Sequence, residues 1–236
     1  MIDKDDNLQV PVVVPAAGIG KRMASDIPKQ YLTLAGKTIL EHTVERLLAH
    51  PNVSKVIVAL NSEDTFFNKL PLNDNPDVIT VTGGSERCDS VLAGLKQVKD
   101  SPVAMVHDAA RPCLTHEDIS QLINHYQQTG RGAILASRVR DTMKRTNADN
   151  QISHSESRDN LWHALTPQLF ATGLLIEALE KALAAKQTIT DEASAMEYCN
   201  HPADVVVGRA DNIKVTQPED LDLAQFILKQ QQRTVE

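Results

Sequence analysis

The chain has 236 residues, of which 42% are hydrophobic and 23% charged, with both signs of charge mixed along the sequence. This length and composition are typical of a folded protein with a substantial core and exclude a largely disordered chain. The formal net charge is −7, which argues against a surface built to grip nucleic acid, although a small cationic pocket is compatible with it.

The sequence gives no indication of a membrane protein, a disulfide-stabilised protein or a metal-binding protein. No apolar run approaches the roughly 20 residues that cross a bilayer, and the acidic first ten residues lack an apolar signal core. Cys88, Cys113 and Cys199 form no C-x-x-C pair, and the eight histidines show no metal-ligand spacing. We therefore expect a cytoplasmic protein that does not associate with membranes.

Short apolar runs alternate with amphipathic stretches along the chain, which is typical of an α/β protein with right-handed crossovers. Thr115 and Asp118 resemble the capping box of a helix. The predicted strands are Val10–Val14, Lys55–Leu60, Val78–Val81, Val103–Val106, Ala133–Ala136, Val205–Val207 and Ile213–Val215. The predicted helices are Ile39–His50, Glu86–Val98, Glu117–Thr129, Leu174–Ala185 and Glu219–Lys229. We expect one α/β domain over residues 1–236, a three-layer sandwich with a mainly parallel sheet.

Residues 138–160 interrupt this alternation. They contain few core-type residues, and "TNADNQ" reads as a turn between two polar strands. An isolated hairpin is only marginally stable in water, so we expect an arm that is held by a partner surface. A surface loop without fixed structure is the alternative interpretation.

The loop after the first predicted strand, "PAAGIGKRM", combines small residues with cations. It matches neither the P-loop pattern nor the complete dinucleotide fingerprint, whose last position is Met23 here. Small residues allow backbone N–H groups to approach an anion, and Arg22 and Lys29 can contact phosphate oxygens. These residues predict a phosphate site; a tight turn with solvated cations is the alternative.

Polar residues also follow later strands, and ligands of parallel sheets bind beyond the carboxyl ends of the strands. Gly84 and Ser90 can bring backbone close to a base, although a plain turn explains them equally well. Asp108 can bind sugar hydroxyls or a metal and Arg111 can bind phosphate, unless the two form only a salt bridge. Thr190 precedes acidic residues and can equally belong to a helix start.

Eight segments taken in order resemble the 2-C-methyl-D-erythritol 4-phosphate cytidylyltransferase family. The resemblance extends over roughly residues 10 to 225, and the ordered set is specific although each segment alone is weak. The segments are "PAAGIGKRM", "PKQY", "GGSERCDSVLAGL", "VHDAARP", "DTMKR", "LWHALTPQ", "TDEASAMEY" and "DNIKVT".

The resemblance implies a Rossmann-like fold of the nucleotide-diphospho-sugar transferase type and a homodimer that exchanges its β-arms. It implies CTP and methylerythritol 4-phosphate as substrates and Mg²⁺ as cofactor, held mainly through the CTP phosphates. No protein ligand to Mg²⁺ is assigned with certainty, and Asp108 is the candidate. No nucleic acid partner is implied.

The resemblance also assigns residues. Ser85 departs from the family pattern, in which some members carry an acidic residue, so no contact is assigned to it. The catalytic cations fall on Arg22, Lys29, Arg158 (from the partner's arm) and Lys214. Nucleotide contacts fall on Ala16, Ala17, Gly18, Gly84, Ser90, Ala109 and Thr166. Contacts to methylerythritol phosphate fall on Asp108, Arg111, Thr142 and Thr190.

The implied reaction is in-line attack of the substrate phosphate on the α-phosphorus of CTP, which gives CDP-methylerythritol and releases pyrophosphate. A phosphate monoester is already an anionic nucleophile, so the absence of a marked base is consistent with it. A cytidylyltransferase for another polyol phosphate, such as ribitol 5-phosphate, is the nearest alternative. A non-catalytic nucleotide-binding regulator is the alternative from another class.

Overall fold

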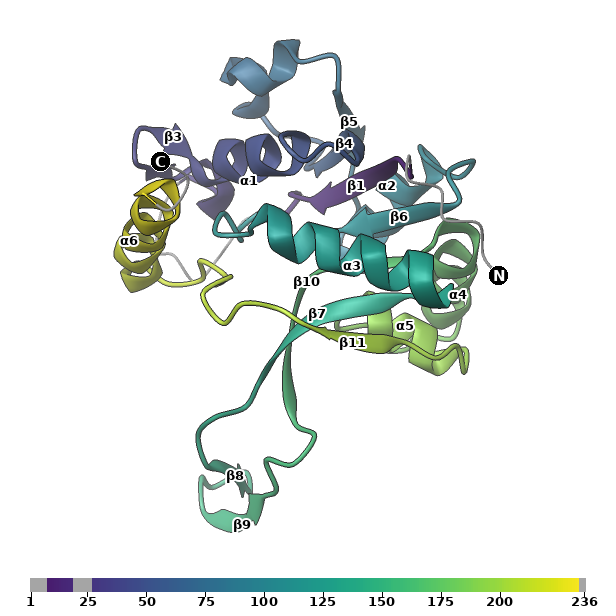
Figure 1. Ribbon diagram of the computed structural model, residues 1–236, viewed down its shortest axis with the longest axis vertical. Helices are drawn as coiled ribbons and strands as arrows, with labels where there is room; N and C mark the ends of the chain where they lie inside the picture. Colours follow the sequence, from purple (N-terminus) through teal and green to yellow (C-terminus); the bar gives the residue numbers. More distant parts are fainter. Residues whose placement is uncertain (1–7, 19–26, 234–236) are drawn as a thin grey trace.

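The computed structural model describes residues 8–18 and 27–233, and its centre is a seven-stranded sheet (Figure 1). From one edge to the other the strands are β11 (Asp204–Val207), β7 (Ala133–Arg138), β10 (Trp162–Ala171), β6 (Val103–Val106), β1 (Val10–Pro15), β4 (Val53–Leu60) and β5 (Val78–Thr82). Strand β10 runs antiparallel to both of its neighbours, and the other pairings in this sheet are parallel.

Helices cover both faces of the sheet, which makes the fold a three-layer α/β sandwich. One face carries α1 (Ile39–Leu48) and α3 (His116–Thr129), and the other carries α2 (Arg87–Lys96), α4 (Thr172–Ala184) and α5 (Glu192–Tyr198). The side chains of β1 alternate between the two cores: Val12 and Val14 join the first and Val13 joins the second. Burial on both faces explains the unbroken apolar sequence of this strand.

A third, smaller core holds α6 (Glu219–Arg233) against the edge of the domain. Residues Ile213–Val215, which the sequence predicted as a strand, form an irregular segment instead. Their apolar side chains pack with Ala224 and Leu228 of α6, so the alternation reflects burial against a helix rather than sheet pairing. The N–H of Val215 nevertheless donates to the carbonyl of Ala110 at 2.8 Å, which fixes this segment beside the end of β6.

The other predicted strands and helices are confirmed to within a few residues, and α3 has the predicted capping box of Thr115 and Asp118. Strand β10, helix α5 and the short elements named at the end of this paragraph were not predicted. Strand β10 contains Pro167 and an irregular register between Ala164 and Gln168, so its sequence lacks a regular alternation. Helix α5 is short, and Asp191 rather than Thr190 caps it. The remaining elements are β2 (Thr33–Leu34), β3 (Lys37–Thr38), and the 3-10 turns η2 (Lys29–Tyr31), η3 (Phe67–Lys69) and η4 (Pro71–Asp74).

A hairpin projects from the sheet between β7 and β10 (Figure 1). Its strands, β8 (Met143–Thr146) and β9 (Ile152–Glu156), pair antiparallel with each other and with no other strand in the described chain. At its base the guanidinium of Arg138 lies 4.4 Å from the ring centre of Trp162. We call residues 138–160 the arm.

No helix within residues 8–18 and 27–233 has the length and apolar character needed to span a bilayer.

Helix α2 lies so close to β1 that one of its positions has no room for a side chain. A Cβ on Gly94 would lie 2.4 Å from a methyl group of Val13, whereas a Cβ on Gly173 of α4 would meet nothing within 4 Å. We expect Gly94→Ala to lower the free energy of unfolding by about 1–3 kcal/mol through overpacking, despite the better helix propensity of Ala. Gly173→Ala should be neutral or slightly stabilising. Denaturant titration of both variants tests this, and equal stabilities would contradict it.

Candidate active site

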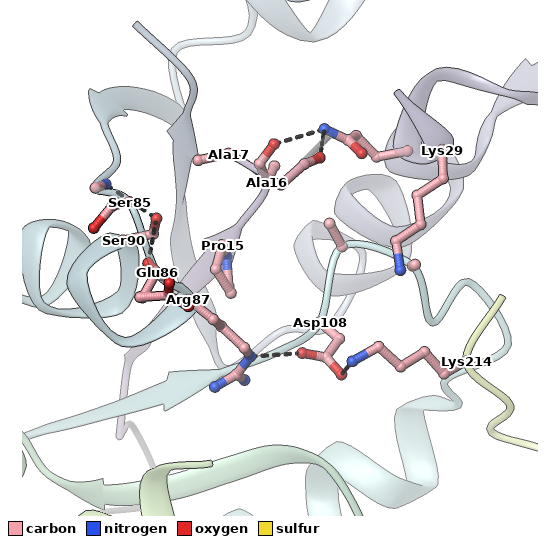
Figure 2. A pocket seen from close by; sticks show the side chains of 15 residues that line it. Pro15, Ala16, Ala17, Lys29, Ser85, Glu86, Arg87, Ser90, Asp108 and Lys214 are labelled. Atoms are coloured by element: carbon pink, nitrogen blue, oxygen red, sulfur yellow. Dashed lines mark hydrogen bonds and ion pairs between the residues drawn. The ribbon is translucent and has the colours of Figure 1, made fainter. Parts of the chain in front are cut away.

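A pocket opens beyond the carboxyl ends of β1 and β6, where parallel sheets bind ligands (Figure 2). Segments far apart in sequence form its walls: the loop after β1, the turn η2, the start of α2, the loop after β6 and the segment before α6. The lining residues are Pro15, Ala16, Ala17, Gly18, Lys29, Gln30, Gly84, Ser85, Glu86, Arg87, Ser90, Asp108, Ala109, Ala110 and Lys214. The pocket therefore brings together most of the predicted nucleotide residues with Lys29 and Lys214.

The loop after β5 packs tightly onto the first turn of α2. A Cβ on Gly83 would lie 2.6 Å from the Ser90 hydroxyl, and one on Gly84 would lie 2.2 Å from the Cβ of Asp89. The N–H of Gly84 donates to the Oγ of Ser90 at 3.2 Å. These glycines therefore have a packing role in addition to any ligand contact. Ser85, to which no ligand contact was assigned, donates its hydroxyl to Asp89 at 3.0 Å.

Asp108 is a buried carboxylate surrounded by cations. Arg87 contacts one oxygen at 3.0 Å, and Lys214 and Arg111 contact the other at 2.9 Å and 3.5 Å. Burial alone would raise the pKa of Asp108, but the charges of Arg87, Lys214 and Arg111 outweigh it and hold the pKa well below its usual range. Asp108 is thus an anion throughout the physiological pH range.

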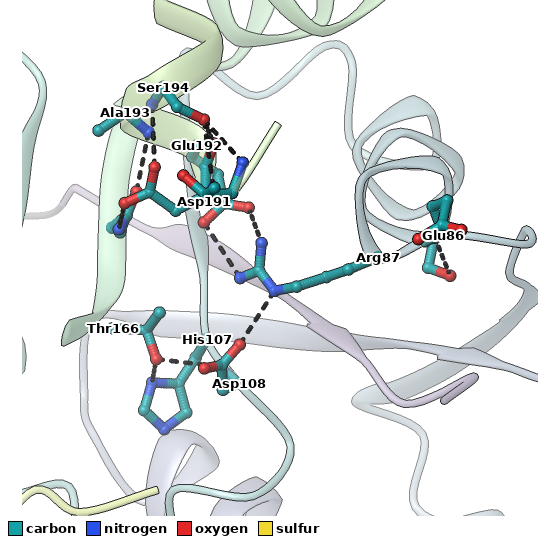
Figure 3. Close-up of polar contacts among 12 residues, drawn as sticks. Glu86, Arg87, His107, Asp108, Thr166, Asp191, Glu192, Ala193 and Ser194 are labelled. Atoms are coloured by element: carbon teal, nitrogen blue, oxygen red, sulfur yellow. Dashed lines mark hydrogen bonds and ion pairs between the residues drawn. The ribbon is translucent and has the colours of Figure 1, made fainter. Parts of the chain in front are cut away.

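Arg87 connects the start of α2 to the start of α5 (Figure 3). Its guanidinium donates to both carboxylate oxygens of Glu192, at 2.6 Å and 3.2 Å, while its Nε donates to Asp108. Burial raises the pKa of Glu192, whose side chain is 1% exposed, and Arg87 opposes that rise. No role was predicted for Arg87, because nothing in the sequence shows that residues 87, 108 and 192 meet.

The backbone of Asp108 is fixed by a chain of hydrogen bonds through His107. Burial lowers the pKa of His107 to about 4, so the ring is neutral at pH 7. Its Nε2 faces the carbonyl of Arg111, which only accepts, and therefore carries the proton. Its Nδ1 then accepts from the hydroxyl of Thr166, which in turn accepts from the N–H of Asp108 (Figure 3).

A second hollow adjoins the pocket and shares Arg87, Asp108 and Lys214 with it. Three of the four residues predicted for methylerythritol phosphate, Asp108, Arg111 and Thr190, line this hollow. Thr166, which was predicted to contact cytidine, lines the hollow rather than the first pocket. Asn212 connects the segments of this region. Its side-chain amide donates to the backbone carbonyl of Thr166, and its backbone carbonyl accepts from the guanidinium of Arg111.

Two described residues of the predicted site line neither the pocket nor the adjoining hollow. Thr142 and Arg158 lie on the arm, where both are exposed, and Arg158 donates to the carbonyl of Arg140. Arg22 lies outside the described residues. Lys29 and Lys214 both approach the pocket, and Figure 2 shows Asp108 between Arg87 and Lys214.

The described residues do not form a protein cage for a divalent ion. No group of three or more His, Cys, Asp or Glu side chains within residues 8–18 and 27–233 is placed to hold a metal. The carboxylate of Asp108, the candidate ligand, is already neutralised by three cations. A metal in this pocket would therefore depend on the phosphates of its ligand for most of its coordination.

Comparison with known proteins identifies the family. The family model "IspD: 2-C-methyl-D-erythritol 4-phosphate cytidylyltransferase" matches residues 10–230. The chain belongs to this cytidylyltransferase family. A member from Pseudoalteromonas atlantica is 57% identical over 218 residues, which is 92% of this chain and 94% of the relative. A member from Escherichia fergusonii is 54% identical over 223 residues, which is 94% of each chain.

A solved structure of the cytidylyltransferase family has the same fold. The crystal structure of the Francisella tularensis protein named 2-C-methyl-D-erythritol 4-phosphate cytidylyltransferase superposes with a TM-score of 0.78 at 34% identity. It covers 93% of this chain and 99% of its own. The Rossmann-like αβα sandwich expected from the sequence is therefore confirmed.

Arg87 should stabilise the protein mainly by neutralising Glu192. Arg87→Met leaves a buried carboxylate without its partner and should lower the free energy of unfolding by about 3–5 kcal/mol. Adding Glu192→Gln should recover part of that loss, because a neutral amide costs less to bury than a carboxylate. Denaturant titration of both proteins measures the effect.

The control for this experiment is Lys96→Met, which removes an ion pair with Glu180 whose two side chains are about half exposed. It should cost less than about 1 kcal/mol. The interpretation is wrong if the double variant is no more stable than Arg87→Met alone.

Proposed function

We propose that the protein transfers CMP from CTP to 2-C-methyl-D-erythritol 4-phosphate and releases pyrophosphate. Family membership at 53–57% identity over more than nine-tenths of the chain carries this proposal. The arrangement of cations around the pocket supports it. CTP occupies the pocket beneath the loop after β1, and the polyol phosphate occupies the adjoining hollow, with Asp108 and Lys214 on the boundary between them.

The chemistry requires charge neutralisation rather than a base. The phosphate monoester attacks the α-phosphorus in line, the new P–O bond forms as the bond to pyrophosphate breaks, and no proton must be removed from the nucleophile. Lys29 and Arg22 stabilise the charge that develops at phosphorus, while Lys214 and the arm's Arg158 orient the attacking phosphate. Asp108, Arg111, Thr142 and Thr190 position the polyol phosphate.

CTP is bound mainly by backbone groups and small side chains. Ala17 and Gly18 offer N–H groups to the triphosphate, and Ala16, whose own N–H donates to the carbonyl of Ala59 at 2.8 Å, lines the same wall. Gly84, Ser90, Ala109 and Thr166 surround cytidine. Members of the family are nucleotidyltransferases, which commonly use a divalent metal. We propose Mg²⁺, bound mainly by the CTP phosphates, as that ion, and a cytoplasmic location where CTP is available.

The arm supports a proposal of a homodimer with sites built in trans. Residues 143–146 are all exposed, and Ile152 is 65% exposed, so the hairpin has no core of its own. Such a hairpin needs a partner surface, and a second copy placing Thr142 and Arg158 in the neighbouring hollow provides one. Residues 1–236 then form one nucleotidyltransferase domain with residues 138–160 as its dimerisation arm.

Pyrophosphate release tests the reaction directly. With CTP, Mg²⁺ and methylerythritol 4-phosphate we expect release, and with ATP, GTP or UTP in place of CTP we expect little. Release with ribitol 5-phosphate instead would keep the chemistry and change the substrate, and no release with any pair would leave a binding protein. Lys29→Ala should lower kcat by roughly 10²–10³. Lys37→Ala, which removes an exposed lysine paired with Glu45, should retain wild-type kcat.

Mixed dimers test the arm. Lys29→Ala and Arg158→Ala should each be nearly inactive alone. After equal mixing under conditions that exchange subunits, random pairing gives one wild-type site in half of the dimers, or about a quarter of wild-type activity. A site built within one chain would give no recovery.

A further inference from the structure

Gln30 is a buried polar side chain that the proposed reaction does not use. It is 3% exposed, lies next to Lys29 on the turn η2, and lines the same pocket. Its Nε2 donates to the carbonyl of Ala16 at 2.6 Å and to the carbonyl of Gly18 at 3.2 Å. The two N–H groups of one amide thus bind two carbonyls of the loop proposed to hold phosphate.

These contacts set the direction of a loop N–H group. In a trans peptide the carbonyl and the following N–H point in opposite directions. Because the carbonyl of Ala16 faces Gln30, the N–H of Ala17 faces away from it. This N–H has no hydrogen-bond partner in the described parts of the chain, and Ala17 lines the pocket. An unpaired N–H at a pocket wall is the donor that a phosphate oxygen accepts from.

The turn that carries Gln30 is itself firmly held. Tyr31 is 5% exposed, and its hydroxyl donates to the carboxylate of Asp64 at 2.7 Å. Its ring stacks on the ring of Phe66, with 5.1 Å between the two ring centres. The N–H of Tyr31 also donates to the carbonyl of Pro28 at 2.9 Å. The core therefore fixes Tyr31, and Tyr31 fixes the two preceding residues.

We propose that Gln30 is a positioning residue for the nucleotide: by holding the carbonyl of Ala16, it orients the Ala16–Ala17 peptide group so that the N–H of Ala17 faces the triphosphate of CTP. Lys29 reaches the pocket from the same turn, so one rigid unit sets the distance between a loop of backbone donors and a cation. This inference rests on the proposed function for the identity of the nucleotide. It assigns Gln30 to the triphosphate and not to the base or the polyol.

The variant Gln30→Met tests the proposal, because it keeps the length and volume of the side chain and removes both donors. We expect kcat/KM for CTP to fall roughly 10- to 100-fold, as small misplacements of a reacting group do. The KM for methylerythritol 4-phosphate should stay at the wild-type value. Inhibition by pyrophosphate should weaken along with CTP, whereas inhibition by cytidine, which lacks phosphates, should not.

A matched control is available on α6. Gln231 also donates from Nε2 to a backbone carbonyl, that of Cys113 at 2.8 Å, and it lies outside the pocket. Gln231→Met removes the same kind of hydrogen bond and should leave all four kinetic measurements at wild-type values. Thermal midpoints of the two variants separate lost stability from lost positioning.

The outcomes distinguish the inference from the function on which it rests. If the wild-type protein releases pyrophosphate and Gln30→Met keeps wild-type kcat/KM for CTP, the role of Gln30 is wrong and the function stands. If the wild type releases none, the proposed function fails, and calorimetry with CTP and Mg²⁺ decides on Gln30: equal affinities would overturn its role. Should Gln30→Met not fold, Gln30→Asn withdraws the same amide by one methylene, and wild-type kinetics there would overturn the role as well.

Discussion

The buried carboxylate of Asp108 is the constraint around which the pocket is organised. A lone carboxylate at that depth would be strongly unfavourable, and it is retained because cations converge on it from α2, from its own loop and from the segment before α6. Each of those segments is thereby tied to the end of β6. Asp108 and Glu192 supply two negative charges, and Arg87, Arg111 and Lys214 supply three positive charges. These five side chains together therefore carry a net positive charge. Anionic substrates fit this imbalance.

The pairing of Lys214 with Asp108 bears on how the proposed site would hold two anions. Lys214 is paired with Asp108 in the structure and lies between the nucleotide pocket and the adjoining hollow. Under the proposed function, an incoming phosphate would compete with Asp108 for that ammonium group, and the carboxylate would retain Arg87 and Arg111. Phosphate binding would therefore exchange one ion pair of Asp108 and leave the other two in place. The free-energy cost of an unpaired buried carboxylate is thereby avoided.

Much of the architecture is readable in the sequence because it depends on local patterns. Val10–Pro15 is apolar throughout because both of its faces are buried, and α3 begins where the Thr115 capping box predicts. Residues 213–215 and 162–171 were misread for a common reason. In the first, burial against α6 imitates strand alternation, and in the second, Pro167 and an irregular register hide a real strand. Packing between distant elements overrode the local signal in both.

The sequence by itself determined the α/β class, the order of most elements, the glycine-containing loop with its cations and, through ordered motifs, the family. Those features depend on residue type and short spacing, which the chain carries locally. Only the tertiary structure decided that Arg87 bridges Asp108 and Glu192, that Thr166 supports Asp108 through His107, and that Gln30 holds the loop after β1. Most of these contacts join residues between 14 and 105 positions apart, and no local pattern encodes which buried polar groups will meet when the strands assemble.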